Sequence, residues 1–251
     1  MKFPSSSLTI RIVRILWLVA LVLWVADWLG PVSCGRTRLL GLALFLVVWF
    51  GPVVLFWRRR VWRWVWLVIT VLPAVILVLP LRHDLPEADT LRDDFVAGLL
   101  RYEGVRYSWG GESPMGIDCS GLIRRGLIDS LFLRGLRTFN PELIRRSIWL
   151  WWHDTTAKEI GQLHAGQTVH VLDAPSINAL DDARLLPGDM AVTRNGIHIM
   201  AYIGEHTWIE ADPGVGRVIR VKAPTAENGW FDIPVHIVRW TVFTHGGLTA
   251  L

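Results

Sequence analysis

The chain has few cysteines and lacks the short motifs of metal and nucleotide sites. Cys34 and Cys119 are its two cysteines, and they fall in regions of different character, so we expect no disulfide between them. The sequence contains no Cys and His spacing typical of zinc, no glycine-rich phosphate loop and no internal repeat. It therefore predicts no metal and no cofactor, and Cys119 is expected to be a free thiol.

Acidic residues are almost missing from the first third of the chain. Residues 1–81 contain nine Lys or Arg and one acid, Asp27, which leaves 17 of the 26 basic and 21 of the 22 acidic residues to residues 82–251. The formal net charge of +4 thus comes from the N-terminal part. Basic residues beside apolar runs usually set membrane topology, so we expect no nucleic-acid partner.

The N-terminal part contains three long apolar runs, at residues 12–29, 39–57 and 64–81. Each is close to the length that spans a hydrocarbon core, and eight tryptophans in this part suit membrane interfaces. A cleaved signal peptide is the alternative for the first run, but no small-x-small site follows it and two more runs do. The sequence predicts three transmembrane helices and a lipid bilayer as partner.

The orientation of these spans follows from the basic residues beside them. Residues expected in the cytoplasm are rich in Lys and Arg, and the two richest segments precede the first span and separate the second span from the third. We therefore expect a multi-pass protein of the inner cell membrane, with a linker at residues 82–94 and a periplasmic domain at residues 95–251. The basic residues in question are Lys2, Arg11, Arg14, Arg58, Arg59, Arg60 and Arg63, against Arg36 and Arg38 in the intervening loop.

Cys119 occupies a position that suits a nucleophile. Asp118 and Cys119 stand where a loop turns into an apolar helix, so Asp118 can cap the helix and Cys119 would lie in its first turn. The helix dipole and the unpaired N–H groups there favour a thiolate and can bind an oxyanion. The alternative is a small, buried hydrophobic cysteine.

His198 is the histidine that best fits a general base. The turn pair Asn195-Gly196 separates two strand-like runs, and His198 begins the second of them. A third strand follows, and a three-residue loop at 203–205 would place Glu210 directly opposite His198. A slip by two residues would bring Asp212 there instead. Either acid could orient the imidazole.

Four segments of the chain form a recognisable set: Gly104-Val105-Arg106-Tyr107-Ser108-Trp109-Gly110-Gly111, Asp118-Cys119-Ser120-Gly121, Leu186-Pro187-Gly188-Asp189 and His198 through Gly204. Together they resemble the NlpC family of papain-like cell-wall cysteine peptidases. The resemblance covers most of residues 95–212 and implies an α+β domain in which the helix bearing Cys119 packs on an antiparallel sheet bearing His198. It implies cleavage of peptidoglycan stem peptides between D-γ-glutamyl and a diamino acid through an acyl-enzyme.

The resemblance also assigns the remaining site residues. Tyr107 matches the family's active-site tyrosine, and Tyr107 and Ser120 are expected to contact the substrate or the oxyanion. Glu210 stands where the family most often has His, and a carboxylate can still orient an imidazole. The tryptophan-rich stretch 131–182 also departs from the family, and we expect its tryptophans to fill core or touch the membrane.

Two other functions use the same residues. An amidase or acyltransferase could form the same acyl-enzyme, and a silent membrane module could bind wall peptides without turnover. A pure binding module has no physical need for the thiol, imidazole and acid together, so we expect a peptidase. The sequence indicates no protein partner.

Overall fold

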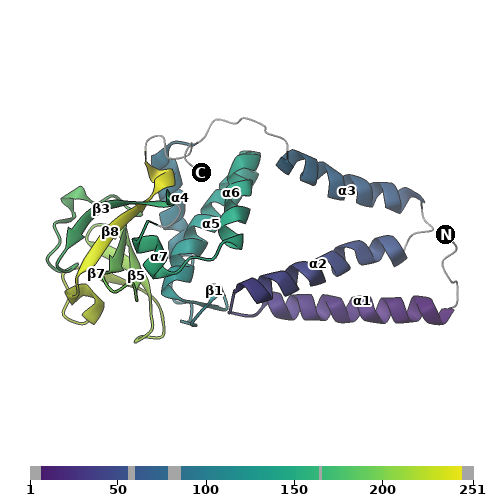
Figure 1. Cartoon of the computed structure of the whole chain (residues 1–251), viewed down its shortest axis with the longest axis horizontal. Helices are drawn as coiled ribbons and strands as arrows, with labels where there is room; N and C mark the ends of the chain where they lie inside the picture. The colour runs from purple at the N-terminus through teal and green to yellow at the C-terminus, as the bar shows by residue number, and fades with distance from the viewer. Residues whose placement is uncertain (1–6, 56–59, 79–85, 164–165, 245–251) are drawn as a thin grey trace.

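The protein combines an N-terminal set of long helices with a C-terminal α+β part. A computed structural model describes residues 7–55, 60–78, 86–163 and 166–244. Figure 1 shows α1, α2 and α3 at one end of the molecule and the sheet at the other, with the remaining helices between them. The predicted α+β class with an antiparallel sheet is confirmed.

The N-terminal helices are α1 (Ser7–Trp28), α2 (Gly35–Leu55) and α3 (Arg60–Val78). Helices α1 and α2 lie side by side (Figure 1), and α3 is joined to α2 by a hydrogen bond from Trp49 Nε1 to Thr70 Oγ1 of 3.0 Å. Two segments, Gly35–Val53 and all of α3, are long and apolar enough to cross a membrane. The ends of the predicted spans 39–57 and 64–81 fall outside the described residues.

The first predicted span, residues 12–29, has less support from the structure than the other two. It coincides with α1, but this helix also contains Arg11, Arg14 and Asp27, and charged side chains are costly in the hydrocarbon core. The structure therefore supports two apolar spans and does not clearly support the third.

The α-helices in the described residues of the C-terminal part are α4 (Ala88–Leu100), α5 (Cys119–Arg137), α6 (Pro141–Trp152) and α7 (Ala157–Gly161). Helix α4 begins inside the expected linker 82–94, because Leu91 continues the buried stripe of Phe95 and Leu99 at every fourth residue. Residues 82–85 of that linker lie outside the described part. Helices α4 and α5 cross closely, since a Cβ on Gly98 would lie 2.9 Å from the Gly126 carbonyl oxygen.

Six strands form one antiparallel sheet in the order β3-β8-β4-β5-β6-β7, and a separate two-stranded ribbon, β1-β2, precedes α5. Strands β4, β5 and β6 are the hairpin and third strand that the sequence predicts. The strands are β1 (Glu112–Ser113), β2 (Gly116–Ile117), β3 (Thr168–Ala174), β4 (Met190–Thr193), β5 (Ile199–Gly204), β6 (Thr207–Asp212), β7 (Arg217–Lys222) and β8 (Val235–Trp240).

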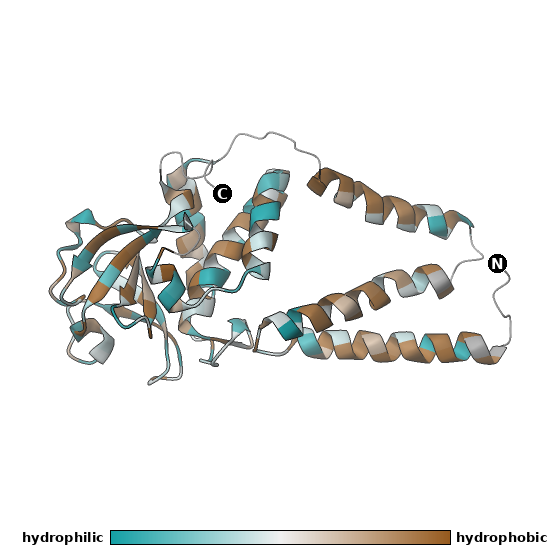
Figure 2. Ribbon diagram, in the orientation of Figure 1, coloured by the Kyte–Doolittle hydropathy of each residue, from teal (hydrophilic) through white to brown (hydrophobic). Residues whose placement is uncertain are grey.

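Side chains cover both faces of the sheet. The larger cluster joins the sheet to α4, α5, α6 and α7, and a smaller one on the other face includes Trp208 and Phe231. Figure 2 shows α1 to α3 hydrophobic over most of their length, whereas α5 and α6 also carry hydrophilic residues. In the tryptophan-rich stretch, Trp151 packs against the larger cluster, and Trp149 and Trp152 are exposed.

Candidate active site

Cys119 is the first residue of α5, and Asp118 is its N-cap. The Asp118 side chain accepts a hydrogen bond from the Gly121 N–H at 2.6 Å and another from the Gly110 N–H at 2.8 Å. The backbone N–H of Asp118 donates to the Gly111 carbonyl at 3.0 Å. The thiol therefore lies in the positive field at the N-terminus of a 19-residue helix. The bonds of Asp118 to Gly110, Gly111 and Gly121 fix the backbone directly before the thiol.

The imidazole of His198 lies beside this thiol. His198 immediately precedes β5 and is 1% exposed. Cys119 Sγ is 3.9 Å from the carbonyl oxygen of Ile197, the residue before His198, and the Cys119 side chain lies near enough to His198 to raise the pKa of the imidazole. Since His198 Nε2 contacts Glu210, Nδ1 is the nitrogen left to exchange a proton with the thiol.

Glu210 contacts His198, although the predicted register is wrong by two residues. Trp208 pairs with Tyr202, where a three-residue loop required residue 206. Continued along the strands, this register places Asp212 at the level of His198. The Glu210 carboxylate instead reaches the imidazole diagonally, with Oε2 2.5 Å from Nε2, because cross-strand side chains two residues apart also lie within reach.

The cause of this shift is a turn that is shorter than expected and lies later in the chain, since Gly204 still pairs with Thr207. Glu205 and His206 both have positive φ, 53° and 59°, which is the backbone of a two-residue type I′ turn. Such turns favour Asn and Gly. The turn residues here are Glu and His, so the sequence does not predict this turn. An irregularity between Tyr202 and Gly204 further changes the pairing.

Two residues that sequence reasoning missed complete the surroundings of His198 and Glu210. Asn228 Nδ2 donates to Glu210 Oε1 at 2.5 Å, and the Trp230 ring stacks on the imidazole at 4.3 Å between centroids. Both belong to the short 3-10 helix η3 (Gly229–Asp232) or its N-cap. No local spacing marks them, because the loop before β8 brings them to the site only in the folded chain.

The electrostatics of the site favour a charged imidazole. Burial alone would lower the pKa of His198, but hydrogen bonds to Cys119 and Glu210 and the negative charges of both raise it to about 9. A protonated His198 therefore fits between the Cys119 sulfur and the Glu210 carboxylate at neutral pH, where it can hold a proton and later release it.

Tyr107 and Ser120 line the same cleft as Cys119, which encloses about 530 Å³. Burial, then the negative charges of Cys119, Asp118 and Asp212, raise the pKa of Tyr107 to about 12, so its hydroxyl remains a donor. The Ser120 hydroxyl donates to Asp118 Oδ1 at 2.9 Å. This bond points the hydroxyl at the cap, which leaves the backbone N–H of Ser120 as its better contribution to an oxyanion site.

The Leu186-Pro187-Gly188-Asp189 segment supports the sheet behind the site. Asp189 is 1% exposed and accepts two hydrogen bonds from Arg239, of 2.6 and 2.7 Å. Gly188 has a φ of +96°, a conformation that glycine adopts without strain. This segment fixes the start of β4, whose partner strand β5 follows His198.

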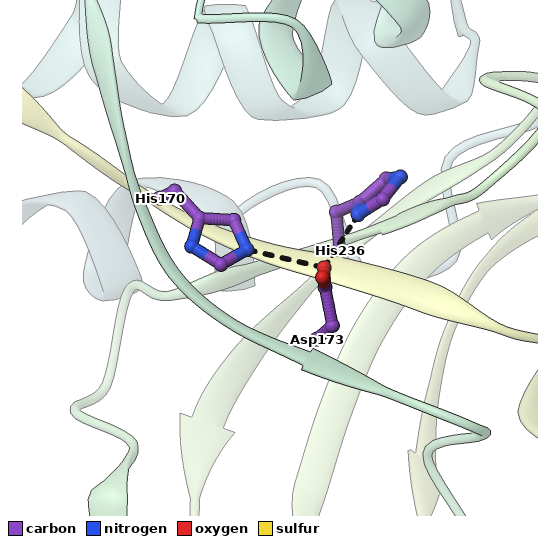
Figure 3. A group of neighbouring side chains, drawn as sticks. All are labelled: His170, Asp173 and His236. Carbon is purple, nitrogen blue, oxygen red and sulfur yellow. Dashed lines mark hydrogen bonds and ion pairs between the residues drawn. The ribbon is translucent and has the colours of Figure 1, made fainter.

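One cluster with metal-ligand side chains lies apart from the nucleophile. His170, Asp173 and His236 come from β3 and β8, and Figure 3 shows both imidazoles directed at the Asp173 carboxylate. His236 Nδ1 is 2.6 Å and His170 Nε2 is 3.1 Å from Asp173 Oδ1. Hydrogen bonds from His236 and His170 lower the pKa of Asp173. The cluster does not border the cleft, so the chemistry at Cys119 does not pass through it.

Comparison with family models finds a match to a short segment around Cys119. The model of the NlpC/P60 family matches residues 104–138, which contain Tyr107, Asp118 and Cys119. The match agrees with the resemblance seen in the sequence and with the prediction of a cysteine peptidase. No curated protein matches the chain.

Several solved structures also align with the chain at low similarity. An NlpC/P60 family protein from Bacillus cereus is 19% identical with a TM-score of 0.39, over 62% of this chain and 41% of that one. The NlpC/p60 domain of the peptidoglycan hydrolase SagA is 21% identical with a TM-score of 0.35, over 59% and 97%. The peptidoglycan hydrolase RipB from Mycobacterium tuberculosis is 17% identical with a TM-score of 0.39, over 65% and 74%. This chain thus spans about two fifths of the length of the Bacillus cereus protein.

Proposed function

We propose that this protein is a membrane-anchored cysteine peptidase that hydrolyses peptidoglycan stem peptides. The observation that carries the proposal is the grouping of Cys119, His198 and Glu210, with the thiol on the first turn of α5 and in the wall of a cleft. The family match over residues 104–138 supports the reaction type. The bond proposed is that between D-γ-glutamyl and a diamino acid, which rests on the family resemblance.

The proposed reaction uses a thiolate and imidazolium pair. The Cys119 thiolate attacks the peptide carbonyl carbon, a C–S bond forms, and the carbonyl oxygen takes the negative charge beside the first-turn N–H groups of α5. The C–N bond then breaks and His198 gives its proton to the leaving amine. Neutral His198 next removes a proton from water, the resulting hydroxide attacks the thioester, and the C–S bond breaks to restore the thiolate.

The roles proposed for the remaining residues follow from their contacts. Glu210 stabilises the imidazolium and fixes its orientation through Nε2, and Asn228 holds the second carboxylate oxygen. Trp230 covers one face of the ring. Tyr107 offers a hydroxyl to substrate or oxyanion from the cleft wall, and Asp118 keeps the nucleophile loop in place.

The positions of α1 to α3 support the proposal of a membrane anchor that leaves the catalytic part, which is the C-terminal α+β part with Cys119, outside the cytoplasm. The loop between α1 and α2 touches the catalytic part, with Ser33 N–H bonded to the Gly110 carbonyl at 2.9 Å. That loop is the one expected outside by the distribution of basic residues. Arg60 and Arg63 lie at the start of α3, at the opposite end of the helices (Figure 1).

The test is activity of the purified full chain in lipid nanodiscs on defined muropeptides, with products identified by mass spectrometry. We expect cleavage that Cys119→Ser abolishes and Cys34→Ser leaves intact. Products in which an added amine has replaced the leaving group, in excess of hydrolysis, would instead indicate an acyltransferase. Binding of muropeptides without turnover by the unaltered chain would contradict the proposal.

A further inference from the structure

The loop between α1 and α2 completes the rim of the active-site cleft. It lies antiparallel to the segment that leads into β1, as an added strand does at a sheet edge. The pairing is made by backbone atoms, so it needs the loop itself and not any particular side chain. Its contacts are Ser33 N–H to Gly110 O at 2.9 Å, Glu112 N–H to Pro31 O at 3.1 Å, and a bridge between Val32 and Gly111.

The paired segment is the one that holds the nucleophile. Gly110 and Gly111 both bond to Asp118, the cap of α5. A Cβ on Gly121 would lie 2.1 Å from the Gly111 carbonyl oxygen, so this backbone is pressed against the first turn of α5. The α1–α2 loop is therefore separated from Cys119 by a single layer of backbone.

Buried charges fasten the same junction. Arg38 of α2 and Arg124 of α5 each bond to a different carboxylate oxygen of Glu112, both at 2.9 Å. The three side chains are 3–4% exposed. Removing one partner of a buried ion pair destabilises a protein far more than removing one partner of a surface pair. These ion pairs therefore hold α2 and the nucleophile helix α5 in a fixed relative position.

Two cavities meet at this junction. The cleft that holds Cys119 also has Ser33 in its wall. A second cavity of about 330 Å³ lies between the outer ends of α1 and α2 and the catalytic part, with Trp24, Trp28 and Phe45 in its wall. Ser33 and Glu112 line both cavities. The two cavities therefore adjoin at Ser33 and Glu112, so an apolar space lies next to the cleft that holds Cys119.

We propose that the substrate is a stem peptide still attached to a membrane lipid, with the peptide in the cleft and the lipid-proximal part at the second cavity. This inference rests on the proposed function and names its substrate class. Ser33 stands two residues before the start of α2, so the cleft opens at the level where the helices leave the bilayer. A peptide carried on a lipid is presented at that level by its own anchor.

The walls of the second cavity fit such a ligand better than a free peptide. Apolar rings from the helices form one side, and the Arg125 side chain on the other side is 28% exposed while paired with Asp129. Asp27 also lines the cavity, so its charge is mixed and apolar contact is the main attraction. Attachment of enzyme and substrate to the same membrane also raises the effective concentration of the substrate at the cleft.

The experiment compares three substrates with the full chain in one preparation of lipid vesicles. They are a muropeptide linked through diphosphate to a polyisoprenyl lipid in the same vesicles, the same muropeptide free in solution, and intact peptidoglycan. We expect kcat/KM for the lipid-linked form to exceed that of the free form by about tenfold or more. Equal values, or faster cleavage of intact peptidoglycan, would overturn the inference and leave the peptidase proposal standing. Failure on all three substrates would refute the peptidase proposal itself.

A matched pair of variants separates the cavity from simple confinement to a membrane. Leu42 and Leu39 are both exposed on α2, but Leu42 lines the second cavity and Leu39 does not. Leu42→Trp should fill the cavity and lower kcat/KM for the lipid-linked substrate about fivefold or more relative to the free one, by loss of apolar contact. Leu39→Trp should leave that ratio unchanged. If the two variants change the ratio equally, the preference comes from confinement alone and the cavity is not the binding site.

Discussion

Replacing Glu210 with glutamine should disturb the charge of His198 while preserving side-chain size. Glu210 is fully buried, with Oε2 2.5 Å from His198 Nε2 and Oε1 2.5 Å from Asn228 Nδ2. The amide carries no charge, so one of the two negative groups that hold the imidazolium disappears. The pKa of His198 should fall from about 9 toward its ordinary value of 6.5.

The size of the effect has two sources. A difference of 2.5 between those pKa values corresponds to about 3 kcal/mol, shared between Cys119 and Glu210. In addition, Asn228 donates to Oε1, so the glutamine oxygen should stay on that side and turn its NH2 group toward His198 Nε2. That contact favours the tautomer with the proton on Nδ1, which cannot accept the thiol proton. A similar carboxylate-to-amide change in trypsin costs about 10⁴ in kcat, and losing a charged hydrogen bond alone about 10 to 100-fold, so we expect a loss between about 10² and 10⁴ at pH 7.

The assay is kcat/KM on one muropeptide from pH 5 to pH 10. With Glu210 in place, activity should fall as His198 loses its proton near pH 9, and Glu210→Gln should move this alkaline limb to lower pH. Asp212→Asn is the matched control, because it removes a carboxylate from the same strand. The Asp212 oxygen that accepts from Gly214 N–H at 2.5 Å and Val215 N–H at 2.9 Å is retained in asparagine. An unmoved alkaline limb in Glu210→Gln, or a larger loss in Asp212→Asn, would refute the assignment.

Three further predictions test the nucleophile, the ion network and the imidazole. Iodoacetamide should modify Cys119 and abolish activity, as measured by peptide mass spectrometry, whereas Cys34→Ser should neither prevent inactivation nor reduce turnover. Glu112→Gln should lower the free energy of unfolding of the catalytic part by about 3–5 kcal/mol, because Arg38 and Arg124 both lose their buried carboxylate, and denaturant titration of the full chain should find a smaller loss for Arg38→Gln, because Glu112 then keeps Arg124. Because the pKa of His198 is raised on folding, its contribution to stability should be complete below about pH 6.5 and lost as pH rises through about 9, and a thermal midpoint no lower at pH 9.5 than at pH 6.5 would contradict this.

Those parts of the site that depend on neighbours in sequence could be predicted from the sequence. Asp118 at a loop end before an apolar run predicts a capped helix, and the cap is present. The pair Asn195-Gly196 predicts the turn between β4 and β5, which pair as expected. The catalytic roles of Cys119, His198 and Glu210 stay predictions, but the structure does bring the three side chains together.

Contacts between distant parts of the chain were not predictable in the same way. The register of β5 and β6 depends on two positive φ angles at Glu205 and His206, residues with no strong preference for them. Asn228 reaches Glu210 across 18 residues, and Arg38 reaches Glu112 across 74. These hydrogen bonds form only in the folded chain, so neither the spacing nor the periodicity of the sequence can predict them.

The junction of helices and cleft also changes what the smallest active unit should be. The composition of the chain suggests a boundary near residue 82, yet a chain cut there would lose Ser33 from the cleft wall and Arg38 from the buried network. Glu112 would then keep one arginine of two, directly beside the backbone that holds the nucleophile. The α1–α2 loop can pair with residues 110–112 only if both lie on the same side of a membrane. An intact active site therefore requires that the α1–α2 loop and the catalytic part lie on the same side of the membrane, and in the proposed membrane protein catalysis would depend on correct insertion of the helices.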